Sequence, residues 1–551
     1  QADTGWQPVQ ETIRKSEKDP RHYQAIKLDN GMVVLLVSDP QAVKSLSALV
    51  VPVGSLQDPE AHPGLAHFLD HMTLMGSKMY PQPDSLAEYL KMHGGSHNAS
   101  TAPYRTAYYL EVENDALEGA VDRLADAIAE PLLAKKYAQR ERNAVNAELT
   151  LARSRDGMRM AQVSAETLNP AHPGARFSGG NLETLSDKPG SPVHDALLAF
   201  HEKYYSANIM KAVIYSNKSL DEQAKIAAAS WGRIPNKSIE RPEITVPVVT
   251  DKQKGLILHY VPAQPRKVVR VEFRIPNNSD RFRSKTDELI GYLIGNRTPG
   301  TLSDWLQSQG LAEGIRADSD PVVTGNSGVF AISVALTDKG LAQRDEVVAA
   351  IFSYLNLLRE KGIDKRYFDE LAHVLDLDFR YPSITRDMSY VEWLADTMIR
   401  VPVEHTLDVV NIADRYAPEA INARLNMMTP ENARIWYISP NEPHNKMAYF
   451  VEAPYQVEKI PTATLRDWQK KAADITLALP TLNPYIPDDF SLIKPVKKPS
   501  QPELLVDEPG LRVIYRPSHY FASEPRADVS VVLRNPTAMN SARRPVLFAL
   551  N

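Results

Sequence analysis

A pattern of a turn signal followed by two apolar strands recurs three times along this chain. The copies begin near Asn30-Gly31, Gly255 and Gly510, at spacings of roughly 225 and 250 residues, which indicate duplication of whole domains rather than a solenoid. A chain of 551 residues also exceeds what one hydrophobic core normally supports. The repeat therefore predicts a multidomain protein built from one duplicated unit.

The first two copies mix strand signals with helical periodicity. In the first copy, residues 22–53 predict two strands and residues 64–75 a helix, and Asp84 is a candidate N-cap for the next helix. A charged helix is expected from residue 135 to about residue 155. This order predicts an α+β fold made of duplicated homologous domains, each a mixed sheet packed with helices.

The expected domain organisation follows from the repeat. It consists of an N-terminal extension at 1–21, a first α+β domain at 22–235, a second at 236–475, a Pro-rich linker at 476–505 and an incomplete third domain at 506–551. The third copy ends soon after its second strand, so we expect the chain to be the N-terminal part of a longer protein. Its first residues, QADTGWQPVQ, lack the features of a signal peptide and are typical of a processed mature start, although an arbitrarily chosen first residue would look the same.

Composition excludes several classes of function. The chain has no cysteine, so thiolate metal sites, thiol nucleophiles and disulfide scaffolds are ruled out. Its net charge is −5, and it lacks a basic stripe interleaved with aromatic residues, so nucleic acid is not expected as a partner. No apolar run approaches the roughly 20 residues that span a bilayer.

The segment GLAHFLDHM, residues 64–72, is a candidate metal-binding helix. His67 and His71 are four residues apart and would lie on one helical face. The spacing alone leaves open that both are ordinary surface or core histidines. The carboxylate of Asp70, directly before the second histidine, favours a metal site, because H-x-x-E-H is the inverzincin motif and this chain has H-x-x-D-H.

A catalytic zinc site needs a third protein ligand and an open fourth position. Glu148 is the candidate, in the charged helix 77 residues after His71. Glu141 lies two turns earlier on the same face and is a candidate to orient a ligand imidazole. A single glutamate in a charged helix more often belongs to a solvated face, so it is the combination with the two histidines that favours a metal site.

These histidines, the helix ERNAVNAEL, the segment GGSHNAST and the duplicated domains resemble the pitrilysin (M16) family of zinc peptidases, which includes insulin-degrading enzyme. The resemblance covers essentially the whole chain. It implies four related α+β domains in two halves that enclose a chamber, with zinc in the first domain only. It also implies that His67, His71 and Glu148 hold one Zn²⁺, that Glu141 is an outer carboxylate, and that the protein is periplasmic.

The same resemblance implies how substrates bind. Asn98 and Ala99 would belong to an edge strand that pairs with the backbone of a peptide substrate. In the second domain, PVVTGNSGVFAISV is similar to the exosite strand that anchors a substrate N-terminus, with Gly328 and Phe330 at its centre. The expected partners are peptide substrates and the C-terminal half of the same polypeptide.

Position 70 departs from the family pattern, because the family base there is glutamate and this chain has Asp70. Aspartate is one methylene shorter, so zinc binding should survive while hydrolysis falls. The leading interpretation is a zinc endopeptidase that is impaired by Asp70 at the position of the general base and by the missing C-terminal half. The alternative is a catalytically silenced peptide-binding shell, and a non-catalytic subunit is less favoured because all three metal ligands are present.

Three other histidines are not expected to bind metal. His93 and His97 are also four residues apart, but Gly94-Gly95 breaks the helix between them. They are predicted to be structural or part of the substrate strand. His62, before Pro63, is predicted to lie in a loop.

Overall fold

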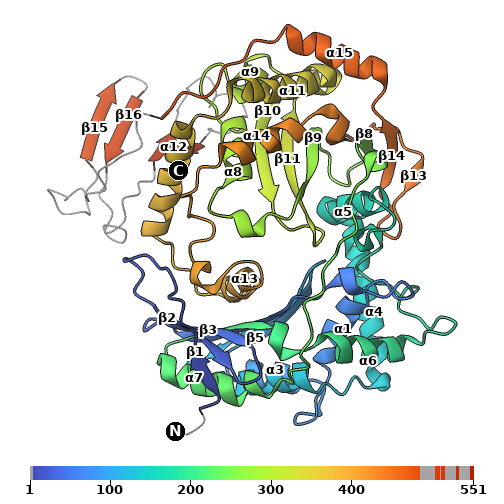
Figure 1. The fold of residues 1–551 in the computed structure, drawn as a ribbon, viewed down its shortest axis with the longest axis vertical. Coiled ribbons are helices and arrows are strands. Elements are labelled where there is room, and N and C mark those ends of the chain that lie inside the picture. The colour runs from blue at the N-terminus through green and yellow to red at the C-terminus, as the bar shows by residue number, and fades with distance from the viewer. Residues whose placement is uncertain (1–3, 484–502, 509–510, 516–528, 533–546, 551) are drawn as a thin grey trace.

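The computed structural model describes residues 4–483 and four short strands beyond them, which are β15 (Glu503–Glu508), β16 (Leu511–Tyr515), β17 (Val529–Val532) and β18 (Leu547–Leu550). Residues 484–502, most of the predicted linker, lie outside the described residues. So does most of the predicted third domain, where β15 pairs antiparallel with β16 and β17 pairs antiparallel with β18. Figure 1 shows the rest of the chain as two lobes, each built around one sheet.

The first sheet has the strand order β1-β2-β3-β7-β4-β6-β5. Its strands are β1 (Trp6–Pro8), β2 (His22–Leu28), β3 (Val33–Ser38), β4 (Lys44–Val51), β5 (Ser96–Thr101), β6 (Thr106–Glu113) and β7 (Lys211–Ser216). Residues 22–53 therefore form three strands, and the prediction of two was wrong. The missed strand is β2, whose sequence HYQAIKL is partly polar because the strand lies near one edge of the sheet and is only half buried.

The second sheet has the order β10-β11-β9-β12-β8-β14-β13. Its strands are β8 (Leu256–Tyr260), β9 (Val268–Pro276), β10 (Ala312–Asp320), β11 (Ser327–Leu336), β12 (Ala433–Ile438), β13 (Lys446–Met447) and β14 (Pro454–Lys459). The order β3-β7-β4-β6-β5 of the first sheet matches β8-β12-β9-β11-β10 here. Both sets have one parallel pair, at the same place. The α+β prediction is confirmed, and the shared topology supports duplication.

Helices cover both sheets. In the first part of the chain they are α1 (Leu65–Thr73), α2 (Ser85–Met92), α3 (Leu117–Ala129), α4 (Lys135–Leu151), α5 (Asp156–Glu166), α6 (Val193–Tyr204) and α7 (Leu220–Ala229). In the second they are α8 (Thr286–Ile294), α9 (Leu302–Ser308), α10 (Asp338–Ala342), α11 (Arg344–Lys361), α12 (Lys365–Arg380), α13 (Met388–Met398), α14 (Pro418–Met427) and α15 (Thr462–Ala473). Asp84 stands at the N-cap of α2, but its side chain makes no capping hydrogen bond. None of the described helices is long and apolar enough to span a membrane.

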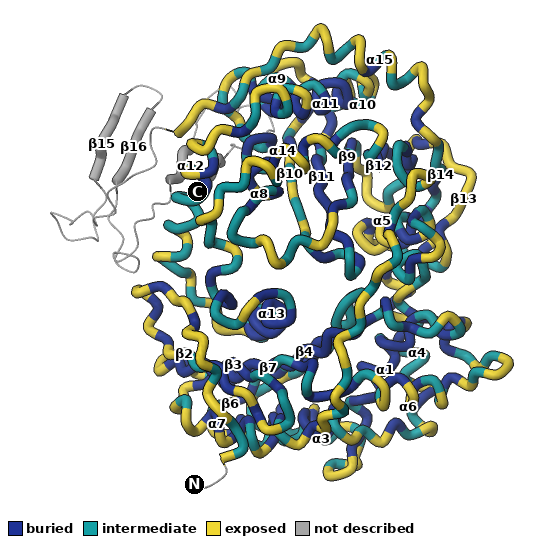
Figure 2. The backbone as a smooth tube through the Cα atoms, viewed as in Figure 1, coloured by how far each residue is buried: buried dark blue, intermediate teal, exposed yellow. Residues whose placement is uncertain are grey.

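The two lobes exchange helices. From the second half of the chain, α13 packs against the first sheet, where Val391 and Leu394 join a core with Leu35 and Val37. Figure 2 shows α13 as largely buried. In return, α5 from the first half packs on the second sheet, where Val163 contributes to the core there. Each sheet therefore depends on a helix from the other half, so the predicted boundary at 235/236 divides the sequence but not the packing.

Candidate metal centre and substrate cleft

The start of helix α1 is fixed by its surroundings. Gly64 has φ +93°, and a Cβ there would lie 2.2 Å from the Cα of Gly180, so only glycine fits. The buried Asp58 carboxylate accepts hydrogen bonds from the backbone N–H groups of Gly64 and Ala66, at 2.7 and 2.8 Å. Burial raises the pKa of Asp58 to about 7, although these hydrogen bonds oppose the shift. Sequence reasoning missed Asp58, because it lies outside the helix that it caps.

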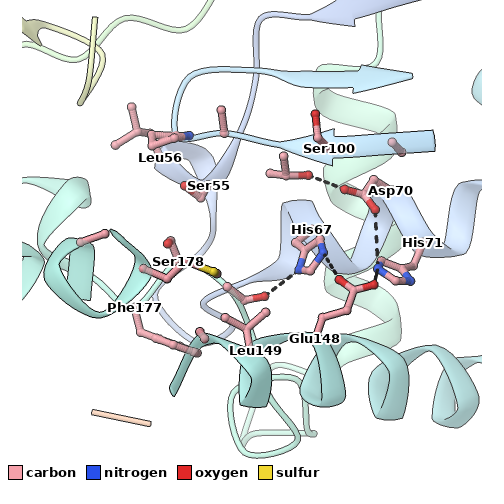
Figure 3. Close-up of a pocket in the computed structure, with 18 of the residues that line it drawn as sticks. Ser55, Leu56, His67, Asp70, His71, Ser100, Glu148, Leu149, Phe177 and Ser178 are labelled. Atoms are coloured by element: carbon pink, nitrogen blue, oxygen red, sulfur yellow. Dashed lines mark hydrogen bonds and ion pairs between the residues drawn. The ribbon is translucent and has the colours of Figure 1, made fainter. Parts of the chain in front are cut away.

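The candidate metal ligands converge between α1 and α4 (Figure 3). The Nε2 atoms of His67 and His71 lie 3.1 and 3.2 Å from the two carboxylate oxygens of Glu148. One donor atom from each residue can be chosen so that all three lie within 4.8 Å of one another. The histidines face α4 because the apolar residues of α1, including Phe68 and Leu69, are buried in the core.

In each of the two histidines, the Nδ1 atom lies near an oxygen atom of a neighbouring residue. His67 Nδ1 lies 2.8 Å from the carbonyl oxygen of Gly179, and His71 Nδ1 lies 3.4 Å from Glu141 Oε1. Because both Nδ1 atoms face acceptors, both Nε2 atoms are left to face the centre of the cluster. Glu141 thus occupies the place expected of an orienting carboxylate.

Electrostatics make this cluster suited to a cation. Hydrogen bonds from His67 and His71 hold the pKa of Glu148 well below its usual range. Burial acts to lower the pKa of His71, but hydrogen bonds with Glu141 and Glu148 outweigh it and raise the pKa to about 10. Two imidazole nitrogens and one carboxylate oxygen are a donor set that Zn²⁺ takes in catalytic sites, so these residues fit the metal.

Asp70 lies between the cluster and strand β5. Its carboxylate is buried, and Oδ2 accepts a hydrogen bond of 2.5 Å from the Thr101 hydroxyl. The other oxygen, Oδ1, is 4.0 Å from His71 Nε2. Burial raises the pKa of Asp70 above its ordinary value. Sequence reasoning did not identify Thr101, which holds this carboxylate from the end of the predicted substrate strand.

Strand β5 carries Asn98 and Ala99 at the end of the first sheet, where it pairs with β6. No other strand among the described residues covers its second edge. The Ala99 N–H donates to the side-chain Oδ1 of Asn98 at 2.8 Å. Both residues line the same cavity as His67 and His71. The structure therefore brings the predicted edge strand to the candidate metal-binding cluster.

Gly328 and Phe330, the predicted exosite residues, do not lie beside the candidate metal ligands as Asn98 and Ala99 do. They lie on β11, which is paired on both sides within the second sheet by β9 and β10. Phe330 is fully buried in the core, so its side chain is not available to a substrate. The structure does not bring either residue to the cavity, and the exosite role of this segment stays a prediction. From this lobe, Arg274, Val323 and Thr324 reach the cavity instead.

The cavity has a volume of about 1140 Å³ and is lined by both lobes. Besides α1 and β5, its wall includes residues of α4, α5 and the loop around Phe177. Such a volume exceeds a typical small-molecule pocket and accommodates a peptide segment.

The other histidines lie as expected outside the cluster. His62 is buried, with its ring nitrogens near the carbonyl oxygens of Thr184 and Ser191. His93 packs on the ring of Tyr89, and His97 lies on β5 in the cavity wall. Within the described part of the chain, His67, His71 and Glu148 form the only group with metal-ligand geometry.

Comparison with protein families gives matches along most of the chain. Residues 33–171 match the family described as insulinase (peptidase family M16). Residues 193–375 match the peptidase M16 inactive domain, and residues 379–551 match the middle or third domain of peptidase M16.

Individual relatives agree with these matches. The chain is 81% identical over 551 residues to Protease 3 of Escherichia coli (strain K12), which covers all of this chain and 57% of that protein. It is 32% identical over 532 residues to insulin-degrading enzyme of Drosophila melanogaster, covering 96% of this chain and 54% of that protein. The crystal structure of pitrilysin is similar with a TM-score of 0.91 at 81% identity, covering 98% of this chain and 58% of that one. The chain thus spans little more than half the length of these relatives, and it belongs to the insulinase (M16) family of peptidases.

Proposed function

We propose that this chain forms the zinc-binding half of a metalloendopeptidase that hydrolyses extended peptides. The observation that carries the proposal is the convergence of His67, His71 and Glu148 within 4.8 Å, beside the carboxylate of Asp70 and inside a large cavity. The names of the relatives, a protease and an insulin-degrading enzyme, point to the same class of reaction. By resemblance to this family, we also propose a periplasmic location.

His67, His71 and Glu148 would hold one Zn²⁺, and Glu141 would keep the His71 ring oriented. Zinc held there would polarise a scissile carbonyl and lower the pKa of a water molecule. Asp70 accepts the proton of that water at its carboxylate and passes it to the nitrogen of the leaving amine. Thr101 donates a hydrogen bond to one oxygen of the same carboxylate.

The substrate would be an extended peptide because one edge of β5 is not paired with another strand among the described residues. A peptide strand added along Asn98 and Ala99 would lie in the cavity with a backbone carbonyl near the metal ligands. To reach the Ala99 N–H it must displace the Asn98 side chain, which now accepts that hydrogen bond. A C-terminal half of the same polypeptide would close the cleft from the other side.

A second candidate, a catalytically silenced peptide-binding shell, is favoured by the placement of Asp70. Its Oδ2 is engaged by Thr101, and its Oδ1 is 4.0 Å from His71 Nε2, so the short side chain is held toward β5. This candidate keeps zinc and peptide binding but lacks turnover.

Two measurements on the full-length protein decide the matter. Metal analysis should find about one zinc per chain, and a quenched fluorescent peptide should be cleaved in a zinc-dependent manner. Zinc without turnover would favour the silenced shell, and absence of zinc would refute the site assignment.

A further inference from the structure

A second part of the cavity wall is basic. The metal centre contributes the carboxylates of Asp70, Glu141 and Glu148, whereas Arg155, Arg176 and Arg274 line the cavity elsewhere. Of these arginines, Arg176 donates to the backbone carbonyl of Asp58. Arg274 is the one that is almost completely withdrawn from solvent, with 6% of its side chain exposed.

Arg274 is incompletely paired. Its Nε lies 3.3 Å from Glu272 Oε1, and its Nη2 donates to the Ser164 hydroxyl at 2.9 Å. Its buried Nη1 has no hydrogen-bond partner among the described residues. An unpaired buried donor on a charged group is costly, because the group has lost its water without gaining an acceptor.

The neighbouring charges do not neutralise Arg274. Glu272 is shared with the fully buried Arg434, whose Nε is 3.2 Å from the same Oε1, and with Arg270, whose Nη2 is 3.6 Å from Oε2. Three guanidinium groups therefore share one carboxylate. Of this group Arg274 lines the cavity, and its positive charge favours an anionic ligand there.

Thr324 provides another unsatisfied donor in the same cavity. It lies in the loop between β10 and β11, and its buried Oγ1 has no hydrogen-bond partner within the described part of the chain. It lines the cavity together with Arg274. A hydroxyl and a guanidinium are both suited to bind a carboxylate.

We propose that Arg274, assisted by Thr324, is a receptor for a carboxylate of the bound peptide, so that the cleft prefers acidic substrates. The carboxylate is either an Asp or Glu side chain or the C-terminal α-carboxylate. A ligand carboxylate that accepts a hydrogen bond from Nη1 would complete the hydrogen bonding of this guanidinium. This inference rests on the proposed function, since it assigns a substrate class to the same cleft.

The test measures binding without hydrolysis. Full-length protein is stripped of metal with a chelator, and fluorescence anisotropy is recorded with four labelled decapeptides of Ala and Ser. These carry either three Glu or three Gln residues at alternate positions, each with a free or an amidated C-terminus. The four peptides separate side-chain carboxylates from the α-carboxylate as the recognised group.

The parent protein should bind at least one carboxylate-bearing peptide about tenfold more tightly than its neutral counterpart, as expected for one charge-assisted hydrogen bond. Arg274→Gln should abolish this preference, and Arg274→Lys should retain part of it because the charge stays. Arg316→Gln serves as the matched control, since Arg316 is exposed on β10 and pairs locally with Asp318.

Equal affinity of the parent for all four peptides, or an unchanged preference in a folded Arg274→Gln protein, would overturn the inference. Circular dichroism checks folding, and the lysine variant keeps the test valid if the glutamine variant unfolds. Zinc content and zinc-dependent turnover are measured separately on the untreated parent. If the untreated parent lacked zinc and turnover, this would count against the proposed function. If it had both but showed no preference for carboxylate-bearing peptides, this would count only against the role of Arg274.

Discussion

Replacing Asp70 by glutamate tests whether the proposed general base is too short. A carboxylate that takes a proton from the attacking water must lie about 2.6–3.2 Å from it. In the structure, Asp70 Oδ1 is 4.0 Å from His71 Nε2, and Oδ2 is held by Thr101. Glutamate extends the side chain by one C–C bond, about 1.5 Å.

The expected increase in kcat of the Asp70→Glu protein can be estimated from these distances. A misplacement on the order of 1 Å can cost about a hundredfold in rate. Part of the gain is offset because the longer side chain must fit a buried position and give up or stretch the hydrogen bond from Thr101. We therefore expect Asp70→Glu to raise kcat at least tenfold, equivalent to about 1.4 kcal/mol of barrier.

Steady-state kinetics on the full-length protein with a quenched fluorescent peptide provide the measurement. Zinc content should not change, and peptide affinity should hardly change, because the base acts mainly in the transition state. Asp221→Glu is a matched control at an exposed position of α7. An unchanged or lower kcat in the Asp70→Glu protein would refute the reasoning and show that aspartate already sits at the right distance.

Three further predictions concern the metal, the edge strand and the basic cluster. In metal titrations, His67→Ala should abolish zinc binding, whereas Glu141→Gln should weaken it about 10–100-fold. If the two variants bound zinc with equal affinity, the distinction between a metal ligand and an orienting residue would be refuted. Ala99→Pro should weaken peptide binding but leave zinc content intact, because proline removes the backbone donor at the free edge; unaltered peptide affinity would argue against β-augmentation. Burial acts to raise the pKa of Glu272, but Arg274, Arg270 and Arg434 outweigh it and lower the pKa from 4.5 to about 2. A lowered pKa stabilises the fold above pH 4.5, and this contribution, on the order of 3 kcal/mol, is lost as the pH falls toward 2. Urea unfolding should therefore show Glu272→Gln to be destabilised at pH 7 and close to the parent near pH 2; a constant difference across this range would contradict the assignment.

Much of the fold and the candidate metal ligands could be predicted from local sequence patterns. The spacing of His67 and His71 places both rings on one helical face wherever that helix lies, because helical geometry is local. The sequence indicates the duplication because each copy repeats the same turn and strand signals. The structure supports it, because the two sheets share a strand order. Strand β2 was missed because its half-buried position allows polar residues that weaken the alternating pattern.

Contacts between distant segments could be learned only from the tertiary structure. Thr101 meets Asp70 across 31 residues of sequence, and Arg274 meets Ser164 across 110. Neither pair has a periodic signal, since the residues come from different elements whose approach depends on the whole fold. The exchange of α5 and α13 between the lobes is of the same kind, because an apolar helix face does not specify which sheet it covers. The sequence by itself therefore determined which side chains share an element, whereas the packing of the two lobes decided which of them share the cleft.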